Sequence, residues 1–143
     1  MAIRSLFCLV ALTVFVFSAV STCFADDDLD HFKTGNKYAG RGQNKLAIEE
    51  FRKAIKIRPR IADYHYNLAN ALFVTDKVKE AIIEYKKAIS INPLDSDFHR
   101  NLGISYIEAG ETSKAREVLK DLKRMSPAKA KQLESFLAEV KKK

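Results

Sequence analysis

The sequence predicts an all-α protein, a right-handed superhelix of three stacked helical hairpins followed by a C-terminal capping helix. Proline recurs at an interval of 34 residues, and alanine recurs at the same interval in the segments between the prolines. These segments also carry apolar residues at helical spacing. A fixed period of this length, with small residues at set positions, is typical of stacked helical hairpins. The prolines are Pro59, Pro93 and Pro127, and the alanines are Ala47, Ala81 and Ala115.

Residues 1–25 are predicted to be an export signal. Arg4 supplies the positive start, and the uncharged run Leu6–Val20 has 15 residues, whereas a bilayer span needs roughly 20. Ala25 ends the leader at a site that a signal peptidase accepts, so we expect cleavage after it. Two alternatives are a retained membrane anchor and a lipoprotein acylated at Cys23, because the residues before that cysteine resemble a bacterial lipobox. In all three cases the rest of the chain is exported, and we expect it in the periplasm.

The composition limits the classes of partner and site. The net charge of +7 comes from 25 basic and 18 acidic residues that are interspersed, which is typical of a solvated surface. We therefore expect no nucleic-acid partner. Both cysteines, Cys8 and Cys23, lie in the leader, so the repeats are predicted to hold neither a disulfide nor a thiolate metal site.

The first hairpin is predicted over residues 28–61. Its first helix lies near residues 29–40 and ends at Gly40–Gly42, because glycine tolerates the backbone angles of a tight turn. The second helix lies near residues 44–57 and ends before Pro59, which cannot extend the preceding helix.

The second and third hairpins are predicted over residues 62–95 and 96–127. The turn of the second hairpin falls at residues 75–77, where Asp76 is expected to cap the next helix. The turn of the third hairpin falls at Gly110.

Residues 128–143 are predicted to form the capping helix and a basic tail. Ser126 and Pro127 are a cap and a first-turn signal. The helix carries an apolar stripe that should cover the end of the third hairpin, with a polar face opposite. The stripe consists of Leu133, Phe136, Leu137 and Val140.

The repeat positions resemble the tetratricopeptide repeat, whose pattern is W-x2-L-G-x2-Y, then A-x3-F, then P. Histidine replaces the tryptophan at His31, His65 and His99, and Thr34 replaces the first leucine. The matching residues are Gly35, Tyr38, Ala47, Phe51 and Pro59 in the first repeat, Leu68, Ala81, Tyr85 and Pro93 in the second, and Leu102, Gly103, Tyr106, Ala115 and Pro127 in the third.

The three histidines are not expected to bind one metal ion. Zinc ligands must come within about 2.1 Å of the ion, whereas equivalent positions in neighbouring hairpins lie about 10 Å apart. We expect each ring to pack in place of an aromatic residue, with one nitrogen bonded locally. The sequence contains no pattern of a catalytic triad and no glycine-rich phosphate loop. It therefore predicts no enzyme, no cofactor and no small-molecule substrate.

The resemblance implies that the first helices of the hairpins line a concave groove that holds a peptide. Asparagines there can both donate to and accept from a peptide backbone. Tyr66, Asn70 and Phe73 are expected to contribute most of the binding energy, and the first two are expected to lie outside the packing columns. The family's carboxylate clamp is not expected, because uncharged or acidic residues occupy its basic positions. The predicted groove residues are Phe32, Lys33, Asn36, Asp63, Tyr66, Asn67, Asn70, Phe73, Asp97, Arg100, Asn101 and Ile104.

Basic residues gather on the second helices and the tail. We interpret them as a solvated convex face, and the alternative is contact of this face, or of a lipidated Cys23, with an anionic membrane surface. The residues are Arg52, Lys53, Lys56, Arg58, Lys86, Lys87, Lys120, Lys123, Arg124 and Lys141 to Lys143.

The sequence thus predicts a non-catalytic adaptor or scaffold that binds a peptide or protein segment in its groove, in the periplasm or at the cell envelope. The first alternative is a structural subunit of a larger envelope assembly, held through its convex face and end helices. The second is an accessory domain for an enzyme on another polypeptide. The partner itself is not predicted.

Overall fold

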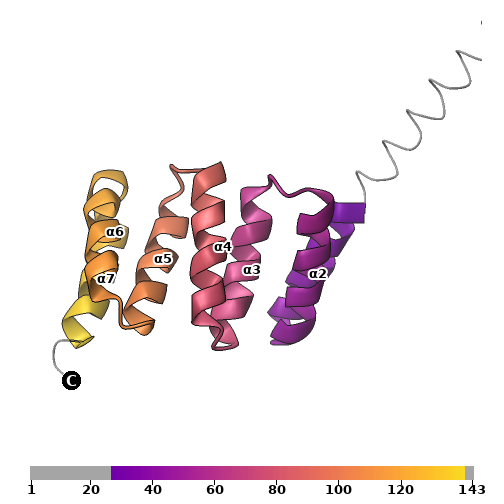
Figure 1. Ribbon diagram of the computed structural model, residues 1–143, viewed down its shortest axis with the longest axis horizontal. Coiled ribbons are helices and arrows are strands. Elements are labelled where there is room, and N and C mark those ends of the chain that lie inside the picture. The colour runs from indigo at the N-terminus through magenta and orange to yellow at the C-terminus, as the bar shows by residue number, and fades with distance from the viewer. Residues whose placement is uncertain (1–26, 141–143) are drawn as a thin grey trace, which may run out of the picture.

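The computed structural model describes residues 27–140, and this part of the protein is all-α, as predicted. The predicted leader, its alternatives at Cys23, and Lys141 to Lys143 lie outside the described residues. Between residues 27 and 140, no helix is long and apolar enough to cross a membrane. The helices pack side by side as successive hairpins (Figure 1). They are a helix over residues 27–40, α2 (Asn44–Ile57), α3 (Ala62–Val74), α4 (Val78–Ile91), α5 (Ser96–Glu108), α6 (Thr112–Met125) and α7 (Pro127–Val140).

The three hairpin turns repeat one backbone conformation. Gly42, Asp76 and Gly110 have φ values of 73°, 63° and 76°, in the left-handed region. Aspartate is among the non-glycine residues that tolerate this region best. The prediction that Asp76 caps α4 is wrong, because α4 begins after Lys77 and its N-terminus has no hydrogen bond from a capping side group. An aspartate cap occurs instead at α5, where the Asp95 carboxylate accepts from the backbone N–H of Asp97 at 2.9 Å.

The core follows the small residues of the repeat pattern. Ala47, Ala81 and Ala115 are fully buried at equivalent positions of α2, α4 and α6. A Cβ added at Gly35 would lie 2.6 Å from the Phe51 ring, inside van der Waals contact. The helix of residues 27–40 can approach α2 this closely because glycine carries only a hydrogen atom at the point of contact.

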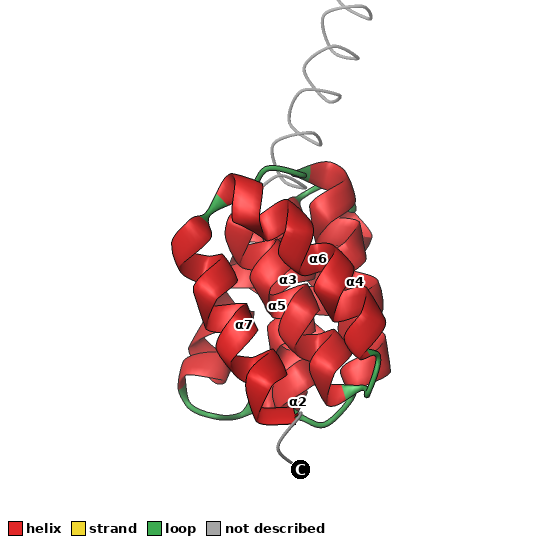
Figure 2. Cartoon of the chain, turned by 90° about the vertical axis from the view of Figure 1, so that its left-hand side faces the viewer, coloured by secondary structure: helices red, strands yellow, loops and turns green. Residues whose placement is uncertain are grey.

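The capping helix α7 is only partly an apolar lid. Leu133 and Leu137 are buried, with 0% and 8% of their surface exposed, and they cover α5 and α6 as predicted. Phe136 and Val140 are each 42% exposed, so the prediction that the whole stripe is covered is wrong. The helix lies at the end of the stack, where Figure 2 looks along the hairpins. The described residues contain no further helix beyond it, so its outer side stays open to solvent.

The histidines at the tryptophan position of the first two repeats hydrogen-bond the two helices of their hairpins to each other, and we call each such pair a clamp. The Nδ1 atoms of His31 and His65 lie 2.6 Å from carboxylate oxygens of Glu50 and Glu84, on the second helix of the same hairpin. His65 also bonds through Nε2 to the Pro59 carbonyl oxygen at 2.9 Å. Both of its ring nitrogens therefore face acceptors, which favours the doubly protonated imidazolium. The bond to Pro59 is the expected local one, and the bond of Nδ1 to Glu84 is a second bond that the sequence did not predict.

We predict that Gly103→Ala destabilises the protein. The added Cβ would lie 2.5 Å from a methyl carbon of the fully buried Leu133, so this side chain or the contact between α5 and α7 must shift. Overpacking of this kind costs about 1–3 kcal/mol of unfolding free energy. Gly40→Ala is the matched control, because nothing lies within 4 Å of its added Cβ and alanine favours a helix. Equal unfolding free energies of the two variants in urea would contradict the close packing.

We predict a pH-dependent contribution of the His65–Glu84 pair to stability. The Glu84 hydrogen bond raises the pKa of His65 against the opposing effect of burial, and the Pro59 carbonyl raises it further. Burial raises the pKa of Glu84, but its bonds with His65 and Lys87 outweigh this and hold the pKa below its ordinary value. The raised histidine pKa means that stabilisation is lost as pH rises through that pKa. The lowered glutamate pKa means that it is lost as pH falls through that one.

The contribution should therefore be complete between the ordinary pKa values of the two groups, roughly 4.3 and 6.5. Chemical denaturation across pH should show that His65→Gln removes this dependence. The control is His99→Gln, because His99 bonds to the Pro93 carbonyl and Val118 stands where Glu84 stands in the preceding repeat. A wild-type profile that His65→Gln leaves unchanged would contradict the clamp.

Candidate functional site

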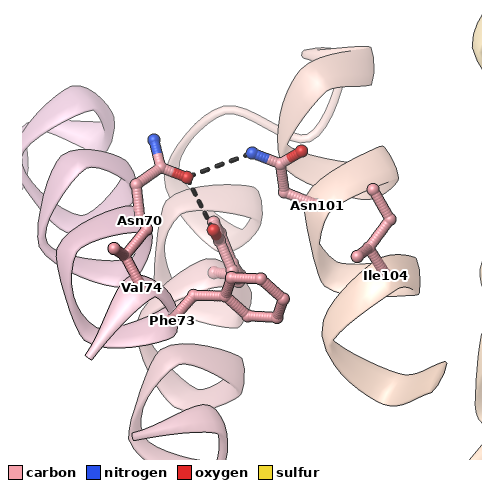
Figure 3. Close-up of a pocket in the computed structure, with 6 residues that line it drawn as sticks. Asn70, Phe73, Val74, Asn101 and Ile104 are labelled. Carbon is pink, nitrogen blue, oxygen red and sulfur yellow. Dashed lines mark hydrogen bonds between the residues drawn. The ribbon is translucent and has the colours of Figure 1, made fainter. Parts of the chain in front are cut away.

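A pocket opens between α3 and α5 and is the best candidate for a binding site. Asn70, Phe73 and Val74 line it from α3, and Asn101 and Ile104 line it from α5 (Figure 3). Tyr85 of α4 completes the lining, and the volume is about 310 Å³. This is within the lower range of small-ligand sites, roughly 300–1,000 Å³. The pocket lies on the first-helix face, which we define as the face formed by residues 27–40, α3 and α5.

A hydrogen-bond network fixes the two asparagines of the pocket. Asn70 Oδ1 accepts from the Tyr85 hydroxyl at 2.6 Å and from Asn101 Nδ2 at 3.0 Å. Asn101 Nδ2 also donates to the Tyr66 hydroxyl at 3.0 Å. Burial raises the pKa of Tyr85 well above its ordinary value, so its hydroxyl keeps its proton and remains a donor. The network thus holds the amides of α3 and α5 in one orientation.

Packed aromatic rings connect the first helices of successive hairpins. Phe32 packs against Tyr64, and Tyr66 packs against Phe98, each pair with ring centroids 4.7 Å apart and ring planes tilted by 33°. Both pairs have the same spacing in the sequence, so the contact repeats with the hairpins. The expectation that Tyr66 lies outside the packing is wrong, because it contacts the core as well as Asn101. Asn70 likewise has a structural role through Tyr85.

Four other predicted groove residues lie outside the pocket, on the helix of residues 27–40 and in the first half of α3. Lys33 and Asn36 are exposed on the first helix, and Asp63 is exposed near the start of α3. Asn67 Nδ2 donates to the Asp63 carbonyl at 2.8 Å, so part of its amide serves its own helix. The structure therefore brings Asn70, Phe73, Asn101 and Ile104 together, and it does not place these four outer residues in the pocket.

The charged residues predicted for the α5 end of the groove are engaged with α7. Lys129 Nζ lies 2.6 Å from an Asp97 carboxylate oxygen, and Arg100 lies 3.7 Å from the other. Arg100 also donates to Gln132 at 3.1 Å. These contacts neutralise Asp97 and hold the Arg100 guanidinium to α7.

Tyr85 is a functional candidate that its place in the repeat pattern predicts only as a packing residue. It occupies the column that holds Phe51 and Leu119 in the other repeats, and its ring is 2% exposed. Its hydroxyl nevertheless reaches the pocket and binds Asn70. The sequence signal for this role is the single hydroxyl in an otherwise apolar column of the repeats, because a buried hydroxyl requires a hydrogen-bond partner.

Six of the predicted basic residues on the second-helix face pair with acids, and Lys56, Lys86 and Lys120 make no such pair among residues 27–140. Such pairing lowers the local positive charge that would attract an anionic surface. The pairs within 4 Å include Arg52–Glu80, Lys53–Glu50, Arg58–Asp28, Lys87–Glu84, Lys123–Glu134 and Arg124–Asp121.

Comparisons with known proteins identify repeat families and similar structures. A family model described as TPR repeat matches residues 35–76, and one described as YpiA-like, C-terminal tetratricopeptide repeats matches residues 63–129. No curated protein matches the sequence. The crystal structure of MamA is 27% identical with a TM-score of 0.76, and the match covers 87% of this protein and 74% of that one.

Two further similar structures are complexes. The first TPR of Spaghetti (RPAP3) bound to the HSP90 peptide SRMEEVD is 18% identical with a TM-score of 0.75, and the match covers 82% of this protein and 95% of that one. The TPR2B domain of yeast Sti1 in its pHsp70 complex is 21% identical with a TM-score of 0.74, and the match covers 79% and 97%. At these identities both comparisons show the fold alone.

We predict that Asn70→Ala lowers stability as well as changing the pocket. The substitution leaves the buried Tyr85 hydroxyl without its acceptor, which costs about 1–3 kcal/mol of unfolding free energy. Asn67→Ala is the control, because its amide makes an exposed bond within α3. The loss caused by Asn70→Ala should shrink in a Tyr85→Phe background, as measured by a double-mutant cycle. Additive losses would show that the hydrogen bond contributes nothing.

Proposed function

Because the protein belongs to the tetratricopeptide repeat family, we propose that it is a non-catalytic adaptor or scaffold that binds a peptide or protein segment along its first-helix face. The pocket between α3 and α5 is the observation that carries this proposal. It combines an apolar lining with two amides that are fixed before any ligand arrives. Pre-organised groups of this kind reduce the entropy lost on binding. The peptide-bound structure of the first TPR of Spaghetti (RPAP3), which has the same fold, supports this proposal.

The central residues of the face should contribute most of the binding energy. Phe73 and Ile104 lie on opposite helices of the pocket, and Val74 is 68% exposed at its edge. Apolar residues around a desolvated centre are the usual arrangement of binding hot spots. Lys33, Asn36, Asp63 and Asn67 would then contact the outer parts of the same segment.

A structural subunit of a larger assembly is the alternative. It requires binding through the second-helix face and the end helices. The exposed Phe136 and Val140 of α7 favour it.

We predict that Val74→Lys weakens capture of the partner from native cell-envelope extract by about tenfold or more, because it places a charge at the edge of the apolar pocket. Ile83→Lys is the matched control, since Ile83 is also an exposed branched residue, 54% accessible on α4. Bound proteins would be quantified by mass spectrometry for wild type and both variants. If Ile83→Lys abolishes capture and Val74→Lys does not, the structural subunit replaces the adaptor.

We also propose that the protein acts in the periplasm or at the cell envelope, and the support is the leader sequence of residues 1–25. Mass spectrometry of the protein isolated from its native cells should then find an N-terminus at Asp26. A diacylglyceryl group on Cys23 would establish the lipoprotein alternative instead. An intact leader in a cytoplasmic fraction would refute export.

A further inference from the structure

The volume, lining and free polar atoms of the pocket between α3 and α5 indicate which kind of segment it binds. This inference rests on the proposed function and adds the class of side group and the part of the backbone that are recognised. The lining is Asn70, Phe73, Val74, Tyr85, Asn101 and Ile104, and none of these residues is charged. A dry cavity of about 150 Å³ holds one benzene molecule. A volume of about 310 Å³ therefore accommodates one large apolar side chain together with its adjoining backbone.

The hydrogen-bond network determines which polar atoms remain for a ligand. A carboxamide oxygen accepts two hydrogen bonds, and its nitrogen donates two. Asn70 Oδ1 already accepts from Tyr85 and Asn101, so both of its positions are filled. Asn101 Nδ2 already donates to Asn70 and Tyr66, so both of its hydrogens are used. The atoms left over are the Asn70 Nδ2 donor and the Asn101 Oδ1 acceptor, one from each side of the pocket (Figure 3).

One donor and one acceptor match the backbone of an extended peptide, which offers a C=O and an N–H at each residue. A carboxylate provides acceptors only, so it would leave Asn101 Oδ1 unpaired. It would also bring its charge against an apolar wall, where an unpaired charge is costly. Arg100, the neighbour of Asn101 on α5, is the nearest candidate cation for a carboxylate. It contacts Asp97 and Gln132 instead and does not line the pocket.

We propose that this pocket takes one uncharged apolar side chain, of the size of leucine or phenylalanine, from an extended segment of a partner protein. Asn70 Nδ2 bonds a backbone C=O beside that residue, and Asn101 Oδ1 bonds a backbone N–H. The pocket rejects an acidic residue at this position. The expected preference for an apolar residue thus differs from the preference of a site that binds an acidic peptide, such as the SRMEEVD segment in the Spaghetti (RPAP3) structure.

A matched series of peptides tests the proposal on the full-length protein. The probes are Ser-Gly-Ser-X-Ser-Gly-Ser peptides with both ends blocked, where X is Leu, Phe, Glu or Lys. A fifth peptide carries Leu with an N-methylated amide at X. Titrations followed by ¹H–¹⁵N NMR detect even millimolar binding and locate it on the protein. We expect Leu and Phe to bind about tenfold or more tightly than Glu, and N-methylation to weaken binding by about fivefold or more.

A charge substitution provides the reciprocal test. Val74→Lys places a cation at the edge of the pocket and should shift the preference from the Leu peptide toward the Glu peptide. Ile83→Lys adds the same charge on α4 and should leave the preference unchanged. Circular dichroism of both variants shows whether the helices are retained, so a change in preference can be separated from loss of the fold.

The outcomes separate this inference from the proposed function. Signals that move at Asn70, Phe73, Asn101 and Ile104 with the expected order of affinities support both. Equal affinities for all X, or tighter binding of the Glu peptide, with signals still moving on the first-helix face, overturn the inference and leave the adaptor function standing. Movement confined to α4 and α6, or no binding by any peptide, overturns both.

Discussion

The close approach of neighbouring helices at small residues is the constraint on which the structure depends. Gly35 faces the Phe51 ring and Gly103 faces Leu133, in each case at a distance that leaves no space for a methyl group. The buried alanines of the second helices keep the same hairpins close from the other side. The pocket between α3 and α5 depends on contacts of the same kind, because α4 packs against both of these helices and its Ala81 and Ala88 are fully buried.

Polar groups inside the stack then make each junction specific. The His65 clamp connects α3, α4 and the Pro59 carbonyl, whereas apolar packing alone would tolerate some sliding of the helices. The Tyr85–Asn70–Asn101 network plays the same part on the other side of α3. Such networks destabilise the fold if one partner is lost, because the remaining group stays buried without a hydrogen bond. The second hairpin, which carries both, is therefore the most tightly specified part of the protein.

The fold could be predicted from the sequence because its determinants are local and repeated. Asn44–Ile57 was predicted to the residue, and the glycine turns at Gly42 and Gly110 follow from backbone preferences that act within a few residues. Features that depend on a neighbouring element were harder. The left-handed conformation of Asp76 depends on the turn geometry, and the exposure of Phe136 depends on what packs beyond α7. Helical periodicity assigns a residue to a face but does not show whether that face is covered.

The candidate site illustrates the same limit at the level of single atoms. The sequence placed Asn70, Phe73, Asn101 and Ile104 on one side of their helices, and the structure brings these four together. It could not show that half of each amide is already committed to Tyr85 and Tyr66, since those bonds connect three helices. This commitment gives the asparagines direction: because one end of each amide is fixed, the other can only donate at Asn70 and only accept at Asn101. Residues that hold the hairpins together thereby also define the polarity of whatever segment lies between them.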